Sequence, residues 1–270
     1  MNRKYWYCSF LVHMGCSSLD GEIIASEMFF ADQYTTYQIN VYLPSNYEAG
    51  QESSWMLMLD GDVGFYNAAA LLEEEITNGA DPIILVGVGQ QETRNRDYTP
   101  TVTEEENMSG GVEAFFSFLD SDVIPFVEQE YSVGVGREYR SITGHSYGGL
   151  ATIWALYHRQ DVYSGYGATS PAIWWDRAVS FEWEREYAQE NEDLAATLYM
   201  SMGQLEITPM NPLFTLFVAD LSSRSYSSLN FLHEELYGHE HYSSWEPGMR
   251  GFIRHMYGGG EGFGWQCCSR

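Results

Sequence analysis

A serine between small residues is the first feature of this sequence that could do covalent chemistry. Ser146 lies in the hexapeptide GHSYGG, residues 144–149. The GxSxG pattern, with Gly144 and Gly148 in its small positions, is typical of a sharp strand-to-helix turn that exposes the serine hydroxyl. His145, inside the turn, is expected to pack with its ring pointing away from it. The alternative interpretation is a tight turn with a capping serine.

A serine hydroxyl attacks a carbonyl carbon only when a base removes its proton, and two histidines follow late in the chain. His239 and His241 lie in the segment GHEHYSSW, residues 238–245. Enzymes built on this turn carry serine, acid and histidine in that order, with the histidine after the last strand. Position favours His241, with His239 as the alternative. Glu240 is a poor acid for His241, since adjacent residues at a strand end point apart.

The elements that must position these residues follow from the hydrophobic pattern. Residues 27–43 alternate between apolar and polar positions, which predicts an antiparallel pair of opening strands. The apolar runs at 55–59 and 82–88 are typical of strands buried on both faces. Strands then alternate with helical patterns, and GHSYGG falls between the two. We therefore expect a mostly parallel central sheet with antiparallel N-terminal strands and helices on both faces.

Four further segments of the pattern bear on the site. Residues 94–101 show no regular pattern and are expected to form a loop. Residues 113–131 predict a helix that Pro125 kinks or restarts. Residues 172–193 are aromatic and charged without a clear core face, so we expect them to cover the site. Residues 196–203 alternate and predict another strand.

The composition limits the classes of partner. The net charge is -25, and Lys4 is the only lysine among 270 residues, so we expect no nucleic-acid partner. Such an acidic surface fits a salty habitat, where screening relieves self-repulsion, and it fits an ordinary acidic enzyme equally well. The sequence carries no apolar run of membrane-spanning length.

The length predicts one domain, at residues 21–257, with a segment at each end. Residues 1–20 combine a basic tip with a short apolar run, and they resemble a degenerate export signal. We expect a cytoplasmic protein, with export as a periplasmic or lipid-anchored protein as the alternative. Residues 258–270 are rich in glycine and are expected to form a flexible tail. The four cysteines lie near the two ends, so no disulfide framework is predicted.

Several motifs together resemble one family. GHSYGG is joined by LDGD at 59–62, RDYTPT at 96–101, SPAIWW at 170–175 and EHYSSW at 240–245. In this order they resemble the putative esterase (esterase D-like) family of α/β-hydrolases, nearest to predicted hydrolases grouped with the siderophore trilactone esterases. The resemblance implies the α/β-hydrolase fold and a serine esterase that cleaves a small-molecule carboxylic ester without a cofactor. It does not name the substrate.

The resemblance also assigns roles at the site. His241 matches the family histidine, and Glu206 lies where the family acid would come. Whether Glu206 completes a triad or a Ser/His dyad operates stays open. The oxyanion that forms on attack needs two N–H donors, which the resemblance places at the backbone amides of Tyr147 and Asp62.

Two pairs of side chains near these motifs have alternative roles. Trp174 and Trp175 are candidates for an acyl or aryl pocket, although paired tryptophans also pack in cores. Arg94 and Arg96 either bind an anionic part of the substrate or tie down their own loop, and we favour the structural role.

Three other function classes could use parts of this sequence. A metal enzyme is disfavoured because the HExxH spacing fails from His233, where Tyr237 stands in place of the second ligand. We therefore expect no metal. An acyltransferase would use the same residues with an alcohol in place of water. A non-catalytic binding module on a hydrolase scaffold is the remaining alternative, since fold does not fix function.

Overall fold

The computed structural model describes residues 10–11, 20–30, 34–106 and 108–258. The segment 1–20 and the tail 258–270 therefore lie outside the described residues, apart from residues 10, 11, 20 and 258. The strands are β1 Phe10–Leu11, β2 Glu22–Phe30, β3 Thr35–Leu43, β4 Trp55–Leu59, β5 Ile84–Gly89, β6 Arg140–His145, β7 Gly165–Thr169, β8 Ala196–Gly203 and β9 Leu229–Leu236. The helices are α1 Phe65–Thr77, α2 Arg94–Tyr98, α3 Val112–Phe118, α4 Ile124–Glu130, α5 Tyr147–His158, α6 Trp175–Ala178, α7 Ser180–Glu190, α8 Met210–Ser223 and α9 Trp245–Tyr257.

One sheet runs through the described part of the molecule, in the order β1-β2-β3-β5-β4-β6-β7-β8-β9. The strands β1, β2 and β3 pair antiparallel, and β3 is also antiparallel to β5. The pairs from β5 to β9 are all parallel. The predicted sheet, mostly parallel with antiparallel N-terminal strands, is confirmed.

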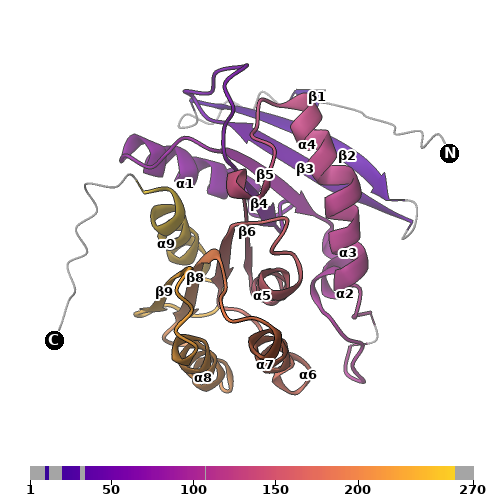
Figure 1. Cartoon of the computed structure of the whole chain (residues 1–270). Coiled ribbons are helices and arrows are strands. Elements are labelled where there is room, and N and C mark those ends of the chain that lie inside the picture. The colour runs from indigo at the N-terminus through magenta and orange to yellow at the C-terminus, as the bar shows by residue number, and fades with distance from the viewer. Residues whose placement is uncertain (1–9, 12–19, 31–33, 107, 259–270) are drawn as a thin grey trace.

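Helices cover both faces of this sheet, as Figure 1 shows with α1 and α9 on one side and α3, α4 and α5 on the other. The reason is visible in β4, where all five residues are buried. Met56 and Met58 pack in the cluster that contains α1 and α9, whereas Leu57 packs in the cluster that contains α3, α5 and α8. Successive side chains of a strand point to opposite faces, so a continuous apolar run needs a helical layer on each side.

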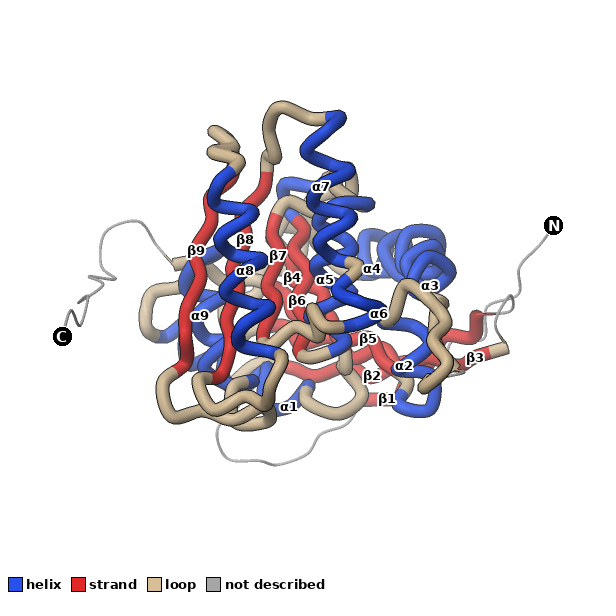
Figure 2. Tube along the Cα trace, turned by 90° about the horizontal axis from the view of Figure 1, so that it is seen from below, coloured by secondary structure: helices blue, strands red, loops and turns tan. Residues whose placement is uncertain are grey.

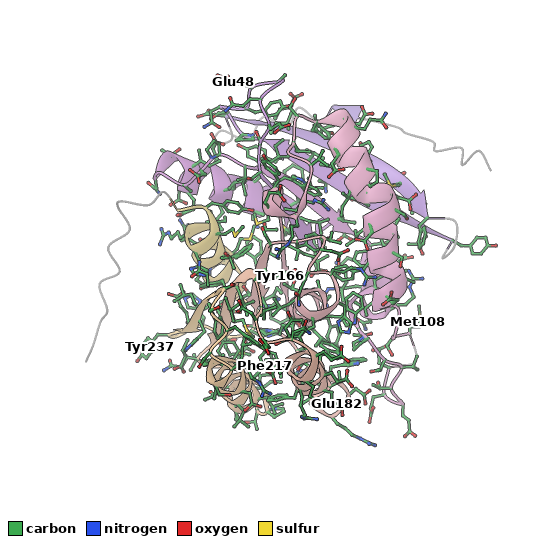
Figure 3. All side chains as sticks on the ribbon, viewed as in Figure 1. Glu48, Met108, Tyr166, Glu182, Phe217 and Tyr237 are labelled. Atoms are coloured by element: carbon green, nitrogen blue, oxygen red, sulfur yellow. The ribbon has the colours of Figure 1, made fainter. Side chains whose placement is uncertain are left out.

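The larger of the two clusters reaches to the far edge of the sheet. Figure 2 shows α8 running alongside β8 and β9, and Phe217 of α8 is fully buried there. In Figure 3, Tyr166 and Phe217 lie in the interior, while Tyr237 stands out at the periphery, where 82% of it is exposed. Among the helices of the described residues, none is both long and apolar enough to cross a bilayer.

The helix predicted at 113–131 is interrupted. A π-helical turn, Leu119–Val123, separates α3 from α4. Pro125 has no N–H for the hydrogen bond that a continuous α-helix would need at this point, and the wider turn accommodates it.

The irregular loop expected at 94–101 is wrong in part, because its first residues form the short helix α2. Asp97 of this helix is 1% exposed and accepts hydrogen bonds from the Tyr37 hydroxyl at 2.9 Å and the Thr93 hydroxyl at 2.7 Å. A buried carboxylate needs such partners, and the bond from Tyr37, 60 residues earlier in the chain, fixes the helix where the local pattern gives no signal.

The cover expected from residues 172–193 is also mostly wrong. Trp183 of α7 packs against His158 of α5, with ring centroids 5.8 Å apart, and Phe181 packs against Phe217 of α8 at 5.3 Å. The helix α7 therefore completes the core beside α5. Only the beginning of this segment, at Trp174 and Trp175, lies beside the serine turn, where both rings contact Tyr147.

A buried carboxylate fastens the last helix to the first. Glu75 of α1 is fully buried and accepts hydrogen bonds from Arg250 and from Arg254 Nε, the latter at 2.7 Å. The helix α9 begins directly after the histidine segment 238–244. The ion pairs of Glu75 thus hold the helix that follows this segment.

We expect Glu75→Ala to lower the free energy of unfolding by about 2 kcal/mol, because two arginines lose a desolvated partner but still reach solvent. Urea unfolding followed by circular dichroism measures this change. Glu74→Ala is the matched control, since the exposed Glu74 also contacts Arg250 and its loss should hardly move the midpoint. Equal midpoint shifts for the two variants would contradict the special role of Glu75.

Candidate active site

Ser146 stands on the turn between β6 and α5 in a strained conformation, with φ 61° and ψ -117°. The turn is held from below, since the Ser146 N–H donates to the Thr169 carbonyl and the Ser146 carbonyl accepts from Ala172 N–H, both at 3.0 Å. A Cβ on Gly144 would come within 2.4 Å of the Gly148 backbone, so only glycine allows this approach of strand and helix. Residues in such conformations persist when their surroundings fix them, and they concentrate at functional sites.

The serine hydroxyl meets a histidine and a carboxylate in one line. His241 Nε2 lies 2.9 Å from Ser146 Oγ, and His241 Nδ1 lies 2.9 Å from Glu206 Oε2. The Glu206 side chain is fully buried, and 26% of the His241 side chain is exposed. The three residues follow the ends of β6, β8 and β9, and the carboxyl ends of parallel strands meet at one edge of a sheet.

The rival histidine lies elsewhere. His239 Nδ1 lies 2.8 Å from the Ser243 carbonyl oxygen within its own loop, and the structure shows no bond from it to Ser146. Geometry therefore brings His241, and not His239, to the serine.

The loop after β4 lies beside the serine turn, since a Cβ on Gly148 would come within 3.4 Å of Asp60 Oδ2. Gly61 N–H donates to the Val88 carbonyl at 3.1 Å, and a Cβ on Gly61 would meet Gly87 at 2.2 Å, so glycine permits the close turn. The Asp62 carboxylate turns away to accept the Gln91 N–H at 2.9 Å. Within the described residues, the N–H groups of Asp62 and Tyr147 donate to no protein acceptor. Both amides are therefore available to a ligand.

An ion pair links this loop to the serine turn. Arg94 donates from Nε to Asp60 Oδ1 at 2.6 Å and from Nη2 to Asp60 Oδ2 at 2.9 Å, and Nη2 also donates to the His145 carbonyl at 3.1 Å. The guanidinium lies over the rings of Tyr98 and Tyr147, at 5.4 and 5.6 Å from their centroids. Burial raises the pKa of the Asp60 carboxyl, and the charge of Arg94 opposes that rise.

A family model described as a putative esterase matches residues 34–255. The chain belongs to the putative esterase family. This match confirms the resemblance carried by the motifs, and it confirms the prediction of a carboxylic ester hydrolase. Ser146, Glu206 and His241 all lie within the matched residues.

Curated relatives and a solved structure agree with the family. The siderophore triacetylfusarinine C esterase of Aspergillus fumigatus is 28% identical over 204 residues, which cover 68% of this chain and 69% of that protein. The ferri-bacillibactin esterase BesA of Bacillus subtilis is 33% identical over 115 residues, which cover 37% of this chain and 39% of that protein. The BES protein of Bacillus cereus superposes with a TM-score of 0.80 at 21% identity, over 91% of this chain and 98% of its own. The α/β-hydrolase fold is thereby confirmed.

The two tryptophans of this esterase are not equivalent. Trp174 is 38% exposed and packs against the ring of Tyr147, with centroids 6.0 Å apart. Trp175 is 2% exposed and donates from Nε1 to the Thr101 hydroxyl at 3.0 Å. Of the two rings, that of Trp174 is exposed, and Trp175 belongs to the core.

Arg94 and Asp60 extend what the sequence indicated. The structural role favoured for Arg94 and Arg96 agrees with their contacts, since Arg96 binds Asp97 at 2.8 Å. The sequence-based prediction assigned Asp60 no separate role, although its place directly after a buried strand was an available signal. Arg94 does more than tie down its own loop, because it joins Asp60 to the backbone of the serine turn.

Removing Arg94 should therefore disturb the site more than the fold. We expect Arg94→Met to lower kcat/KM for p-nitrophenyl butyrate by about 100-fold. The reason is that a shift of about 1 Å between the loop after β4 and the serine turn misplaces the reacting groups. Steady-state kinetics measure the loss. Arg185→Met, on an exposed position of α7, is the control and should retain wild-type kinetics. A loss below threefold in Arg94→Met would show that the ion pair does not set this geometry.

Proposed function

We propose that this esterase works through an acyl-enzyme on Ser146, with His241 as general base and general acid. The observation that carries the proposal is the unbroken line from Ser146 Oγ through His241 to Glu206, with both distances at 2.9 Å. Heavy atoms at this separation allow direct proton transfer to the imidazole.

In the first half of the proposed reaction, His241 Nε2 takes the Ser146 proton as Oγ attacks the ester carbonyl. The buried carboxylate of Glu206 accepts a hydrogen bond from Nδ1–H, which fixes the tautomer and balances the imidazolium charge. The oxyanion is received by the N–H groups of Tyr147, directly after the serine, and of Asp62, in the loop after β4. His241 then donates its proton to the leaving alcohol.

In the second half, water takes the place of the alcohol. His241 removes a proton from the water, which attacks the acyl carbonyl, and the proton returns to Ser146 as the acid leaves. The same donors stabilise the second oxyanion. Water as the acceptor, and not a second alcohol, makes the enzyme a hydrolase.

The surroundings of the serine favour an ester with a bulky apolar or aromatic part. Trp174 exposes its ring beside Tyr147, and Leu205 and Ile207, on either side of Glu206, are 56% and 75% exposed. Exposed apolar side chains gathered at a catalytic edge are typical of ligand-binding surfaces. The two curated relatives are named a siderophore triacetylfusarinine C esterase and a ferri-bacillibactin esterase, and we propose an ester of that kind as the substrate.

A fluorophosphonate probe tests the proposed nucleophile without knowledge of the natural substrate. We expect one adduct per chain, located on Ser146 by peptide mass spectrometry, together with loss of p-nitrophenyl butyrate turnover. Heat-denatured protein is the control and should not react, because the free serine hydroxyl is a weak nucleophile. Turnover that survives complete labelling, or an adduct on another serine, would reject the proposal.

A further inference from the structure

The backbone carbonyl of His241 accepts two hydrogen bonds. Ser244 Oγ donates to it at 2.6 Å, and His145 Nε2 lies 2.8 Å from it. A carbonyl oxygen can only accept, so His145 Nε2 carries a proton. The ring of His145 lies beside the His241 ring, with centroids 4.6 Å apart.

The Ser244 hydroxyl continues into a buried chain of hydrogen bonds. Ser170 Oγ lies 2.7 Å from Ser244 Oγ, and Gly203 N–H donates to Ser170 Oγ at 3.4 Å. Each hydroxyl has one hydrogen, and Ser244 donates its hydrogen to the His241 carbonyl. Ser170 is therefore the donor in its bond to Ser244. Ser170 and Ser244 are both fully buried. This chain ties the ends of β7 and β8 to the loop after β9.

The loop that carries His241 is tied to the loop after β8 through residues 238 and 239, since Gly238 N–H donates to Gln204 Oε1 at 3.2 Å and the His239 carbonyl accepts from Leu205 N–H at 2.9 Å. Tyr237 and Tyr242, on either side of the histidine, are 82% and 87% exposed. The His241 ring must nevertheless hold Nε2 and Nδ1 at 2.9 Å from two different residues. Rigid support for a catalytic side chain comes from packing and from hydrogen bonds of the residues around it.

We propose that His145 and Ser244 are positioning residues, which fix the backbone of His241 so that its imidazole stays within reach of both Ser146 and Glu206. This inference rests on the proposed function, since it assigns these residues to the orientation of the general base. Neither residue touches the reacting atoms. His145 ends β6 and directly precedes Ser146. The nucleophile and the residue that holds the base are therefore neighbours in sequence.

The state of the His145 ring suits this task. Burial, together with the nearby His241, lowers the pKa of His145 to about 4, so the ring is neutral near pH 7. A neutral ring with its proton on Nε2 donates to the carbonyl without placing a second positive charge beside the imidazolium of His241. The groups that face the His145 ring are His241, Ser244 and the guanidinium of Arg94, and none of them is an acid.

The test compares His145→Leu with His145→Gln in the full chain. Leucine removes the donor, and the glutamine amide restores one at a similar reach. We expect His145→Leu to lower kcat for p-nitrophenyl butyrate about 10- to 100-fold with KM changed less than threefold, and His145→Gln to stay within about threefold of wild type. The rate of fluorophosphonate labelling at Ser146 should follow the same order.

A second variant, Ser244→Ala, tests the inference in case His145→Leu does not fold. Ser244→Ala removes the other donor and should lower kcat about three- to tenfold, less than His145→Leu because His145 still holds the carbonyl. Wild-type kcat in folded His145→Leu, or in Ser244→Ala should the leucine variant not fold, overturns the inference. Equal losses in the leucine and glutamine variants, with native near-UV circular dichroism, also overturn it.

The same labelling separates this inference from the proposed function. Absence of a Ser146 adduct in the wild type would reject the proposed function, and the inference with it. A wild-type adduct combined with unchanged kinetics in the His145 and Ser244 variants would reject the inference alone.

Discussion

Replacing Ser146 by alanine should lower kcat/KM for p-nitrophenyl esters by at least about three orders of magnitude. Without the hydroxyl no acyl-enzyme forms, and only substrate binding and the oxyanion donors remain to assist water. The turn should stay intact, because alanine keeps the Cβ and the backbone bonds to Thr169 and Ala172 do not involve the hydroxyl. Acetate, butyrate and octanoate esters assayed in parallel would also begin to size the acyl pocket.

Two controls make this result specific. Ser117→Ala, on an exposed position of α3, should retain wild-type kinetics. An excess of chelator should leave wild-type turnover unchanged, since the proposed steps use only side chains and backbone amides. If Ser146→Ala kept its activity, or if the chelator abolished that of the wild type, the serine mechanism would be wrong and a metal-assisted one would have to be considered.

Replacing Glu206 by glutamine should lower kcat by about three to four orders of magnitude. The uncharged amide cannot balance the imidazolium, and it can donate to Nδ1 and so favour the wrong tautomer of His241. The Ser146–His241 contact would remain, so KM should change little. Steady-state kinetics over a range of pH measure both kcat and KM.

The matched control for Glu206 is Glu240, an exposed carboxylate in the loop that carries His241. Glu240→Gln removes a carboxylate next to His241 in sequence, but Glu240 does not contact the ring, and we expect kcat within about twofold of wild type. Retention of more than a third of the activity in Glu206→Gln would instead establish a Ser146–His241 dyad. That outcome would leave the acyl-enzyme proposal standing and assign Glu206 to the structure of its loop.

Much of the fold could be predicted because the signals were local. The run at 55–59 is one strand with all five residues buried, and the break at Pro125 falls next to the π-helical turn. Helix α2 was missed because Asp97 is held by Tyr37, 60 residues earlier in the chain. The segment 172–193 was misplaced because a charged and aromatic helix does not reveal from its own pattern which neighbours it packs on. Both failures concern contacts distant in sequence.

The sequence by itself determined that Ser146 would stand on a strand-to-helix turn, because the glycines and apolar residues that require the turn lie within a few positions of it. Only the tertiary structure decided which partners reach that serine. His241 rather than His239, the contact of Glu206 and the Asp60–Arg94 pair depend on how the ends of β4, β6, β8 and β9 lie along one edge of the sheet. The burial of Trp175 beside an exposed Trp174 depends on Tyr147 of α5 and on Thr101, which come from segments distant in sequence. A local pattern encodes the conformation of its own segment, whereas distances between segments are set by the packing of the whole domain.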